Sequence, residues 1–476
     1  MEEQKPPSGA PMAAPRSRAV WIVVAVLAVV VVVILAAAVG GLFNPSTPAK
    51  PALRLGVLLS LTGDLSQYGP GDTKGAVLAV EQINAAGGVL GQPIALVTED
   101  DQTNPTAAVG ATTKLINQNH VNGIIGAQFS GGTIPSISIA KAAGVPMISP
   151  SATSPALSNL TLTGGYFFRT APSDALQGVV AANYLYTNLS YRWISILARD
   201  DSYGRGLAGV VTSRFNALAG TGGHVNHTEI IDPKAPNFNG NLATLYSFNP
   251  QAVYFVGFPG EGIVVMSNWQ AAVGANPSYD KPWIFSEGLK SQQFMDDMRG
   301  VGVDVTKIKG TAPVSPFGPI YDTFVSQYKT RFFNQAPVLY ADYTYDCVYL
   351  YALAAQKAGS VNGTAIRAQL QSVSSASTGT VIKPGEWAKA LTELAAGRLV
   401  NWEGAAGSEN FDANGDVRGS YEVWGVNTTF KLERIAFIPD SSIQGSAFTM
   451  VANQAPVSMT SSFVATVQVA ANLRRH

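Results

Sequence analysis

From residue 53 onward, short apolar runs alternate with longer stretches in which apolar residues recur at helical spacing. Strands that alternate with helices of about 10–15 residues indicate βαβ units, and such units form parallel sheets. No other feature of the chain limits its fold as strongly, and it predicts the α/β class. The first series is expected to form strands at 53–59, 94–98, 123–125 and 146–148, and helices at 74–85, 107–118 and 134–143.

A second series of the same kind begins near Ala175. Each series covers roughly 120 residues, the size of an ordinary domain, so we expect two similar α/β lobes. After Gly310 further helices are expected at 321–333, 340–358 and 386–396, while residues 372–377 are polar. The second series is expected to form helices at 175–189, 206–219, 241–248 and 262–273, and strands at 193–197, 229–231, 252–256 and 283–285.

The composition excludes several classes of protein. The 476 residues include 31 Lys and Arg against 31 Asp and Glu, so the formal net charge is zero. A nucleic-acid-binding protein needs a basic surplus, and a disordered chain is polar and highly charged, whereas here 13 % of residues are charged and 46 % are hydrophobic. The one cysteine, Cys347, excludes an intrachain disulfide and a thiolate metal cluster. We therefore expect a folded protein that is held by its apolar core and has no nucleic-acid partner.

Residues 19–43 contain no charged or polar side chain. A stretch of about 20 apolar residues is long enough to cross a bilayer as a helix, whereas the apolar core of a signal peptide has about 7–15 residues. We therefore expect an uncleaved transmembrane helix, and the small residues 36–38 leave cleavage open as an alternative. Arg16 and Arg18 precede the helix, and the positive-inside rule then places residues 1–18 in the cytosol.

The rest of the chain is expected to lie on the outer side of the cell membrane. Residues 44–51 are rich in proline and predict a short, stiff linker. No cysteine follows the apolar segment, so a lipid anchor on an N-terminal cysteine is excluded. Five Asn-x-Ser/Thr sequons are compatible with an outside location, at Asn159, Asn188, Asn226, Asn362 and Asn427.

No group of residues in the sequence is arranged for catalysis, and we expect neither an enzyme nor a cofactor or metal. There is no Gly-x-Ser-x-Gly or His-Glu-x-x-His motif. His224 and His227 precede a predicted strand at a spacing that does not converge on one metal, so we interpret them as surface residues. Asp412, Asn414 and Asp416 have the spacing of calcium ligands, but valines stand where the calcium loop requires Gly and Glu. A hairpin turn on Asn414-Gly415 is the better interpretation.

Polar loops recur at the carboxyl ends of the predicted strands, which is where open α/β sheets bind ligands. In the first series, Ser130 lies in the loop that leads into the helix expected at 134–143, while Ser151, Ala152 and Thr153 follow the next strand. Hydroxyl groups and the free N–H groups of a helix N-terminus suit a carboxylate. Each hydroxyl on its own could instead be a helix cap.

The corresponding loops of the second series carry an acid and aromatic side chains. Glu287 follows the strand at 283–285, and Tyr203 and Phe258 follow two other strands, while Tyr68 stands in the first loop of the chain. An acid can hold an ammonium group, and aromatic rings can enclose an apolar side chain. Taken singly, an aromatic residue in such a loop more often packs in the core than contacts a ligand, and an acid more often lies in solvent. Their joint placement at strand ends favours a cleft for an α-amino acid.

The chain contains the segments GVLLSLTGDLSQYG, IIGAQFSGGT, GVPMISPSATSPAL, FFRTAPSDALQG, DDSYGRGLA and WIFSEGL. These segments resemble the branched-chain amino-acid (Leu/Ile/Val) binding proteins of bacterial and archaeal uptake systems. The resemblance extends from about residue 53 to about residue 439, in order and with few gaps. It implies the type I periplasmic binding protein fold, in which three crossing segments join two Rossmann-like lobes and the ligand is trapped between them.

The resemblance implies which segments form each lobe. Residues 52–170 and 311–420 are expected in the first lobe, and residues 171–310 and 421–441 in the second. The crossing segments are expected near 169–172, 310–313 and 420–424. Residues 442–476 form a C-terminal extension to which we assign no role.

The resemblance also implies roles for single residues. Ser130 and Thr153 match the family's carboxylate-binding hydroxyls, and Ser151 matches the residue beside them whose carbonyl accepts from the ligand ammonium. Glu287 matches the ammonium-binding acid. The aromatic walls match Tyr68 and Tyr203, and Phe258 stands where a Tyr is common. This sequence departs from the family at Gln128 and Phe129, which are unusual, and at Gly131 and Gly132, which replace hydroxyl residues of some members.

The function implied by the resemblance is that of the solute-binding component of an ABC importer, which closes on an amino acid and docks to permease subunits. The transmembrane helix departs from the secreted or lipid-anchored relatives and implies a tethered protein. An alternative of another class is a ligand sensor without transport, although 18 residues are too short for a cytosolic signalling domain. Urea, short amides and aromatic acids are rival ligands.

Overall fold

The computed structural model describes residues 51–375, 377–443 and 451–452. The chain divides into two units, Met1–Lys50 and Pro51–His476, and the description below concerns the second. The expected cytosolic segment, the expected transmembrane helix at 19–43 and nearly all of the linker lie outside the described residues, as does most of the C-terminal extension. Among the residues that are described, no helix combines the length and the apolar character needed to span a bilayer.

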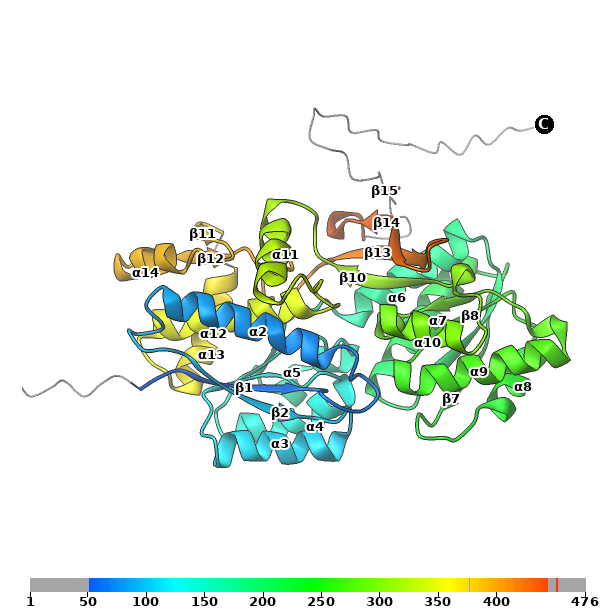
Figure 1. Ribbon diagram of the computed structural model, residues 1–476, viewed down its shortest axis with the longest axis horizontal. Helices are drawn as coiled ribbons and strands as arrows, with labels where there is room; N and C mark the ends of the chain where they lie inside the picture. The colour runs from blue at the N-terminus through cyan, green and yellow to red at the C-terminus, as the bar shows by residue number, and fades with distance from the viewer. Residues whose placement is uncertain (1–50, 376, 444–450, 453–476) are drawn as a thin grey trace, which may run out of the picture. The chain divides into compact units, whose positions relative to one another are not determined.

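The first sheet has five parallel strands in the order β2-β1-β3-β4-β5. Helix α2 lies on one side of β1 and β2, and α3 and α4 lie on the other (Figure 1). Its central strand β1 is apolar over nearly its whole length and buried on both faces, as is usual for parallel strands. Leu55 and Val57 belong to the core beneath α2 and α12, while Leu58 belongs to the core beneath α3 and α4. The elements are β1 Arg54–Leu59, α2 Gly69–Ala85, β2 Ala95–Asp100, α3 Pro105–Asn117, β3 Gly123–Gly126, α4 Ser130–Ala142, β4 Met147–Ser149, α5 Leu160–Thr163, β5 Phe167–Arg169 and α12 Ala341–Ala358.

The second sheet has eight strands in the order β15-β14-β13-β10-β9-β8-β6-β7. The strands from β10 to β7 run parallel, and β13, β14 and β15 are added antiparallel. Ile196 and Ala198 of β6 pack with α6 and α7 on one face, and Leu197 packs with α8, α9 and α10 on the other. The elements are α6 Asp174–Asn183, β6 Trp193–Arg199, α7 Ser202–Ala219, β7 His224–Ile231, α8 Asn239–Ser247, β8 Ala252–Val256, α9 Pro259–Ala275, β9 Trp283–Phe285, α10 Gln292–Gly300, β10 Lys309–Val314, β13 Ser420–Val426, β14 Leu432–Ile438 and β15 Val451–Ala452.

The chain passes between the two sheets three times, at residues 170–173, 315–318 and 403–419. The expected lobe boundary after residue 310 falls inside β10, and the boundary after 420 falls on the first residue of β13. Both strands belong to the second sheet, so residues 311–314 and 420 lie there rather than in the first lobe. The segment between the last two passages returns to the first core and forms α11 Pro319–Arg331, α12, α13 Gly363–Ser374, β11 Thr380–Ile382, α14 Trp387–Ala395 and β12 Val400–Trp402.

The structure differs from the sequence-based expectation in three further places. His224 and His227 lie inside β7 rather than before it, because the half-exposed side chains of this strand give it no apolar signal. Helix α13 extends into the stretch expected to be polar, and its buried Ile366 and Leu370 recur at helical spacing. Gly415 has φ +84° in the expected turn, but the described residues on either side form no paired strands, so the turn is not a β-hairpin.

Candidate ligand-binding site

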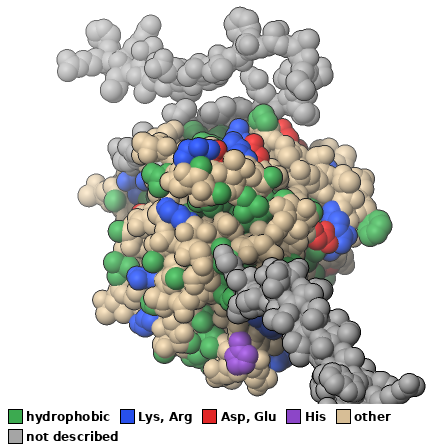
Figure 2. Space-filling model, turned by 90° about the vertical axis from the view of Figure 1, so that its left-hand side faces the viewer, with side chains coloured by type: hydrophobic (Ala, Val, Ile, Leu, Met, Phe, Trp, Pro, Cys, Tyr) green, Lys and Arg blue, Asp and Glu red, His purple; other side chains and the backbone are tan. Residues whose placement is uncertain are grey.

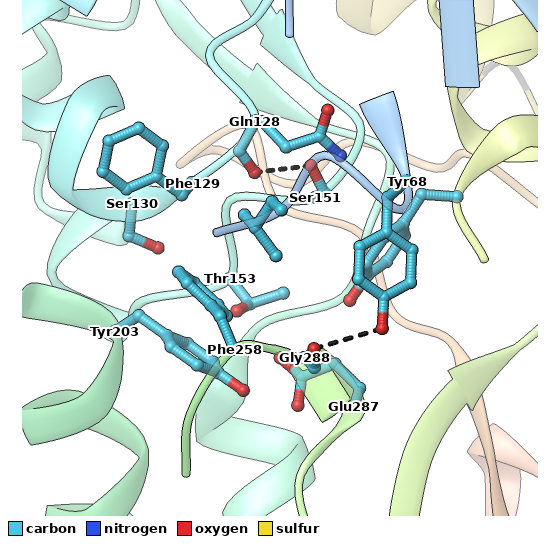
Figure 3. Close-up of a pocket in the computed structure, with 12 residues that line it drawn as sticks. Tyr68, Gln128, Phe129, Ser130, Ser151, Thr153, Tyr203, Phe258, Glu287 and Gly288 are labelled. Atoms are coloured by element: carbon cyan, nitrogen blue, oxygen red, sulfur yellow. Dashed lines mark hydrogen bonds between the residues drawn. The ribbon is translucent and has the colours of Figure 1, made fainter. Parts of the chain in front are cut away.

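The loops at the carboxyl ends of the two parallel sheets meet at a cleft (Figure 3). It encloses about 350 Å³ of space, part of which is continuous with solvent. Seven of the eight residues singled out from the sequence line the cleft, and the eighth, Ala152, is fully buried beside them in the chain. The lining residues are Leu65, Tyr68, Gln128, Phe129, Ser130, Ser151, Thr153, Tyr203, Phe258, Glu287, Gly288 and Tyr340.

Hydroxyl groups of the first lobe lie at one end of the cleft. Ser130 begins α4, and the first N–H groups of a helix have no partner within it. The Ser130 Oγ accepts a hydrogen bond from the backbone N–H of Ser154 at 3.1 Å, which leaves the hydroxyl proton for another acceptor. Ser151 instead donates its hydroxyl proton to the carbonyl of Gln128 at 2.6 Å. Ser130 is therefore better placed than Ser151 to donate to a carboxylate, while Ser151 can offer its carbonyl.

Arg169 fixes the loop that carries Ala152 and Thr153. Its guanidinium is fully buried at the end of β5 and pairs with Asp416 at 2.7 Å. It also donates to the carbonyl oxygens of Ala152 at 3.2 Å and of Ser154 at 3.0 Å. Because these two carbonyls stand on either side of Thr153, Arg169 sets the position of the binding loop.

Replacing Arg169 with Met is expected to lower the free energy of unfolding by about 3–5 kcal/mol, because Asp416 and two loop carbonyls lose a buried partner. Chemical denaturation of the full-length protein measures this loss. The matched control is Arg418→Met, which breaks an exposed pair with Asp440 and is expected to cost less than about 1 kcal/mol. Equal losses in the two variants would contradict the role given to Arg169.

Glu287 provides a carboxylate at the other end of the cleft. Its side chain follows β9 and is 3 % exposed, and Gln177 of α6 donates a hydrogen bond to it. Burial raises the pKa of Glu287 to about 7, although hydrogen bonds from Tyr203 and Gln177 act in the opposite direction. Near neutral pH the carboxyl group therefore stands between its two charge states, and a bound ammonium group would favour the charged one.

Asp174 is a second buried acid near Glu287, and the interpretation of the sequence missed it. It lies in the first turn of α6 and is fully buried, and the Thr153 hydroxyl interacts with its carboxylate. Burial, followed by the charge of Glu287, raises the pKa of Asp174 well above its ordinary value. Asp174 is not a lining residue, so it acts on the cleft through its charge. In the sequence it follows Ser173, the pattern of an ordinary helix N-terminus, which concealed it.

Aromatic side chains close the cleft from both lobes. Tyr203 and Phe258 stack with ring centroids 5.2 Å apart and planes inclined by 11°. The Tyr203 hydroxyl lies within hydrogen-bond distance of the Ser286 Oγ, at 2.9 Å, next to Glu287. From the first lobe, the Tyr68 hydroxyl donates to the carbonyl of Gly288 at 3.1 Å and so connects the two lobes across the cleft (Figure 3).

Two other lining residues, Tyr340 and Leu65, were also missed. Tyr340 precedes α12 with φ +75°, a left-handed conformation that bulky residues rarely adopt and that occurs often at functional sites. No sequence pattern signals this conformation. Leu65 is an apolar residue in a loop, and only its burial against the second lobe reveals its place. Gln128 and Phe129, the departures from the family pattern, both line the cleft.

The described residues contain no cluster of three or more His, Cys, Asp or Glu side chains able to hold a metal ion. His227 is hydrogen-bonded to Glu229 at 2.7 Å and stacks on Phe248 at a centroid distance of 4.4 Å. On the face shown in Figure 2, Lys and Arg side chains are scattered rather than gathered into one patch. This face offers no stripe of positive charge for a nucleic acid.

Comparison with known proteins identifies the class. The family model described as periplasmic binding protein matches residues 52–393, so the chain belongs to this family. Its fold is the α/β fold of type I periplasmic binding proteins, with two lobes. The relatives include proteins named Leu/Ile/Val-binding proteins, which confirms the resemblance recognised in the sequence. The relatives are binding proteins rather than enzymes, and family membership classes the chain with them.

Individual relatives show the extent of the similarity. An amino acid binding protein of Pseudomonas aeruginosa is 32% identical over 220 residues, which are 46% of this chain and 58% of that protein. A Leu/Ile/Val-binding protein homolog of Brucella suis is 28% identical over 307 residues, 64% of this chain and 78% of that protein. The chain spans 55% to 61% of the length of the first curated relatives it matches.

Two solved structures are similar over nearly their whole length. A leucine binding protein from Thermotoga maritima has a TM-score of 0.68 and 24% identity, covering 82% of this chain and 99% of that one. A branched-chain amino acid transporter substrate binding protein from Streptococcus pneumoniae, in complex with isoleucine, has a TM-score of 0.65 and 25% identity, covering 80% and 98%.

Proposed function

We propose that this chain is the solute-binding component of an ATP-driven importer and that its lobes close on an α-amino acid with a branched or aliphatic side chain. The arrangement of charges in the cleft carries the proposal. Ser130, Thr153 and the N-terminus of α4 stand at one end and Glu287 at the other, while the buried Asp174 lies outside the lining and interacts with Glu287. An α-amino acid carries a carboxylate and an ammonium group, and each can form charge-assisted hydrogen bonds at one of these ends.

The names of the relatives support a branched-chain side chain, and the aromatic rings of Tyr203, Phe258 and Tyr68 offer an apolar surface for it. Delivery to permease subunits is inferred from the same relatives. Benzoate is bound by a solute-binding protein of Rhodopseudomonas palustris with the same fold, at 19% identity and a TM-score of 0.63 over 85% of this chain and 98% of that one. Benzoate carries no cationic group that could pair with Glu287 and Asp174. Because buried acids without a partner are unfavourable, a ligand of this kind is disfavoured here.

The two lobes are proposed to move about the three passages of the chain, with the ligand between them. In this proposal the first lobe comprises residues 52–170 and the later return to the first sheet, and the second lobe comprises residues 171–310 together with β10 and all of β13. The apolar segment at 19–43 is proposed to tether this binding domain to the outer face of the membrane, with residues 1–18 in the cytosol.

A thermal-shift screen of the full-length protein tests the proposed ligand class. The ligands are the twenty amino acids, urea, short amides and benzoate. Leucine, isoleucine and valine are expected to raise the unfolding temperature, because a ligand that binds only the folded state stabilises it. A shift with benzoate or an amide and none with any amino acid would contradict the proposal.

Replacing Asp174 with Asn is expected to weaken leucine binding by about tenfold, because one of the two negative charges near the ligand ammonium is lost. Isothermal titration calorimetry measures the change. The matched control is Asp322→Asn, which removes an exposed acid from the first turn of α11, outside the cleft lining, and is expected to leave the affinity unchanged. Unchanged affinity in the Asp174 variant would show that its charge does not reach the ligand.

A further inference from the structure

Asp64 reaches from the first lobe into the second. It lies in the loop between β1 and α2, which also carries Tyr68. Its Oδ2 is 3.0 Å from the Nζ of Lys234 and 3.9 Å from an Nη of Arg199, and both of these residues belong to the second lobe. The side chains of Asp64 and Arg199 are 14 % and 3 % exposed, so their contact is shielded from solvent, whereas Lys234 is 60 % exposed.

A third contact joins Asp64 to the start of α9. A Cβ placed on Gly260 would lie 2.4 Å from the Asp64 Oδ1 and 2.8 Å from the Asp64 Cβ, closer than real Cβ contacts. Gly260 is the second residue of α9, so the carboxylate lies against the first turn of a 17-residue helix. A helix N-terminus carries partial positive charge and stabilises an anion there. The approach requires glycine at 260, because any side chain would occupy the place of Asp64.

Arg199 connects this contact to the aromatic wall of the cleft. Its guanidinium carbon lies 3.7 Å from the centroid of the Phe258 ring. Its Nη1 is 2.7 Å from Glu261, whose carboxylate also accepts from the backbone N–H of Phe258 at 2.8 Å. Its Nε is 2.7 Å from Asp201, the N-cap residue of the helix that carries Tyr203. Arg199 thus holds the backbone segments of both stacked rings.

We propose that Asp64 is a positioning residue that couples lobe closure to the aromatic wall. When the lobes close, its carboxylate enters the contact site formed by Arg199, Lys234 and Gly260, and this contact holds Arg199 against Phe258. This contact stabilises the closed form specifically, because Asp64 belongs to the first lobe and its three partners belong to the second. This inference rests on the lobe closure in the proposed function and not on the identity of the ligand.

The test uses the full-length protein with Gly260→Ala, Asp64→Gly and the double variant. The matched control is Gly274→Ala on the same helix, where a Cβ would meet no atom within 4 Å. Hydrogen exchange of residues 60–68 and 258–262, leucine affinity and unfolding temperature are measured. Gly260→Ala is expected to speed exchange in both segments and to weaken leucine binding about tenfold. It should not lower the unfolding temperature, because alanine favours the helix more than glycine does.

In the Asp64→Gly background, Gly260→Ala is expected to change neither exchange nor affinity further, because the whole side chain that it would clash with, the Cβ included, is gone. Equal effects of Gly260→Ala with and without Asp64 would overturn the inference, as would unchanged exchange in both segments of the single variant. If wild-type protein does not bind leucine, the proposed ligand class fails, and the exchange data alone decide the role of Asp64.

Discussion

Replacing Glu287 with Gln is expected to weaken leucine binding by at least ~100-fold. Glutamine keeps the size of the side chain and can still accept a hydrogen bond from Gln177, so the main change is the loss of the negative charge. A ligand ammonium group left without its buried partner costs about 3–5 kcal/mol, and each 1.4 kcal/mol is about tenfold in Kd. Isothermal titration calorimetry on the full-length variant measures the loss.

The matched control is Glu409→Gln, because Glu409 is as buried as Glu287, at 2 % against 3 % exposure, and does not line the cleft. Its affinity for leucine is expected to equal that of the wild type. Unchanged leucine binding in Glu287→Gln would show that Glu287 is not the ammonium partner.

A stability measurement separates lost binding from unfolding. Burial raises the pKa of Glu287 from its ordinary value to about 7, so its charged form destabilises the ligand-free protein above that pH, and stability rises as the pH falls through this window. Glu287→Gln should therefore be at least as stable as the wild type above pH 7, by up to about 3 kcal/mol. A variant that lost both affinity and stability would not support the assignment.

The affinity for leucine is expected to fall as the pH is lowered through about 7. Below that pH Glu287 is protonated in the ligand-free protein, and a bound ammonium group must displace the proton. Displacement of one proton weakens the apparent affinity about tenfold per pH unit below the pKa, and the affinity levels off above it. Asp174 interacts with Glu287, so the two acids titrate as a pair and the midpoint belongs to both.

Calorimetry in buffers of different ionisation enthalpy measures the proton release directly. Wild-type protein is expected to release protons on binding leucine near pH 6, and Glu287→Gln is expected to lose most of this release. An affinity that stays constant between about pH 8 and about pH 5 would contradict the raised pKa as the cause of the expected pH dependence.

The alternation of strands and helices could be predicted from the sequence because the parallel strands are buried on both faces. Strands such as β1 and β6 therefore appear as short apolar runs between helical patterns. Three of the missed strands carry this signal weakly, because β5 has three residues, β10 contains Pro313 and β14 is half-exposed. β13 is buried throughout, but Ser420 and Glu422 interrupt its apolar residues. β10 and β13 decide where the chain makes its second and third passages between the lobes, which explains why these two crossings were expected several residues away from their places.

The site residues that follow strands could be found, since the carboxyl ends of parallel strands meet at one edge. Ser130, Thr153 and Glu287 could be predicted in this way. Asp174 and Tyr340 were not, because their importance lies in burial, charge and backbone conformation, which a sequence pattern does not record. Asp64 depends on the way the two lobes meet, and no local pattern predicts that contact.

The central claim is that the cleft recognises a carboxylate at one end and an ammonium group at the other. Calorimetry of the full-length protein with L-leucine, 4-methylpentanoate and 3-methylbutylamine tests it directly, because the second ligand lacks the ammonium group and the third lacks the carboxylate. Leucine is expected to bind saturably, and each of the other two at least ~100-fold more weakly. Binding of 4-methylpentanoate as tight as that of leucine, or no binding of leucine at all, would contradict the account.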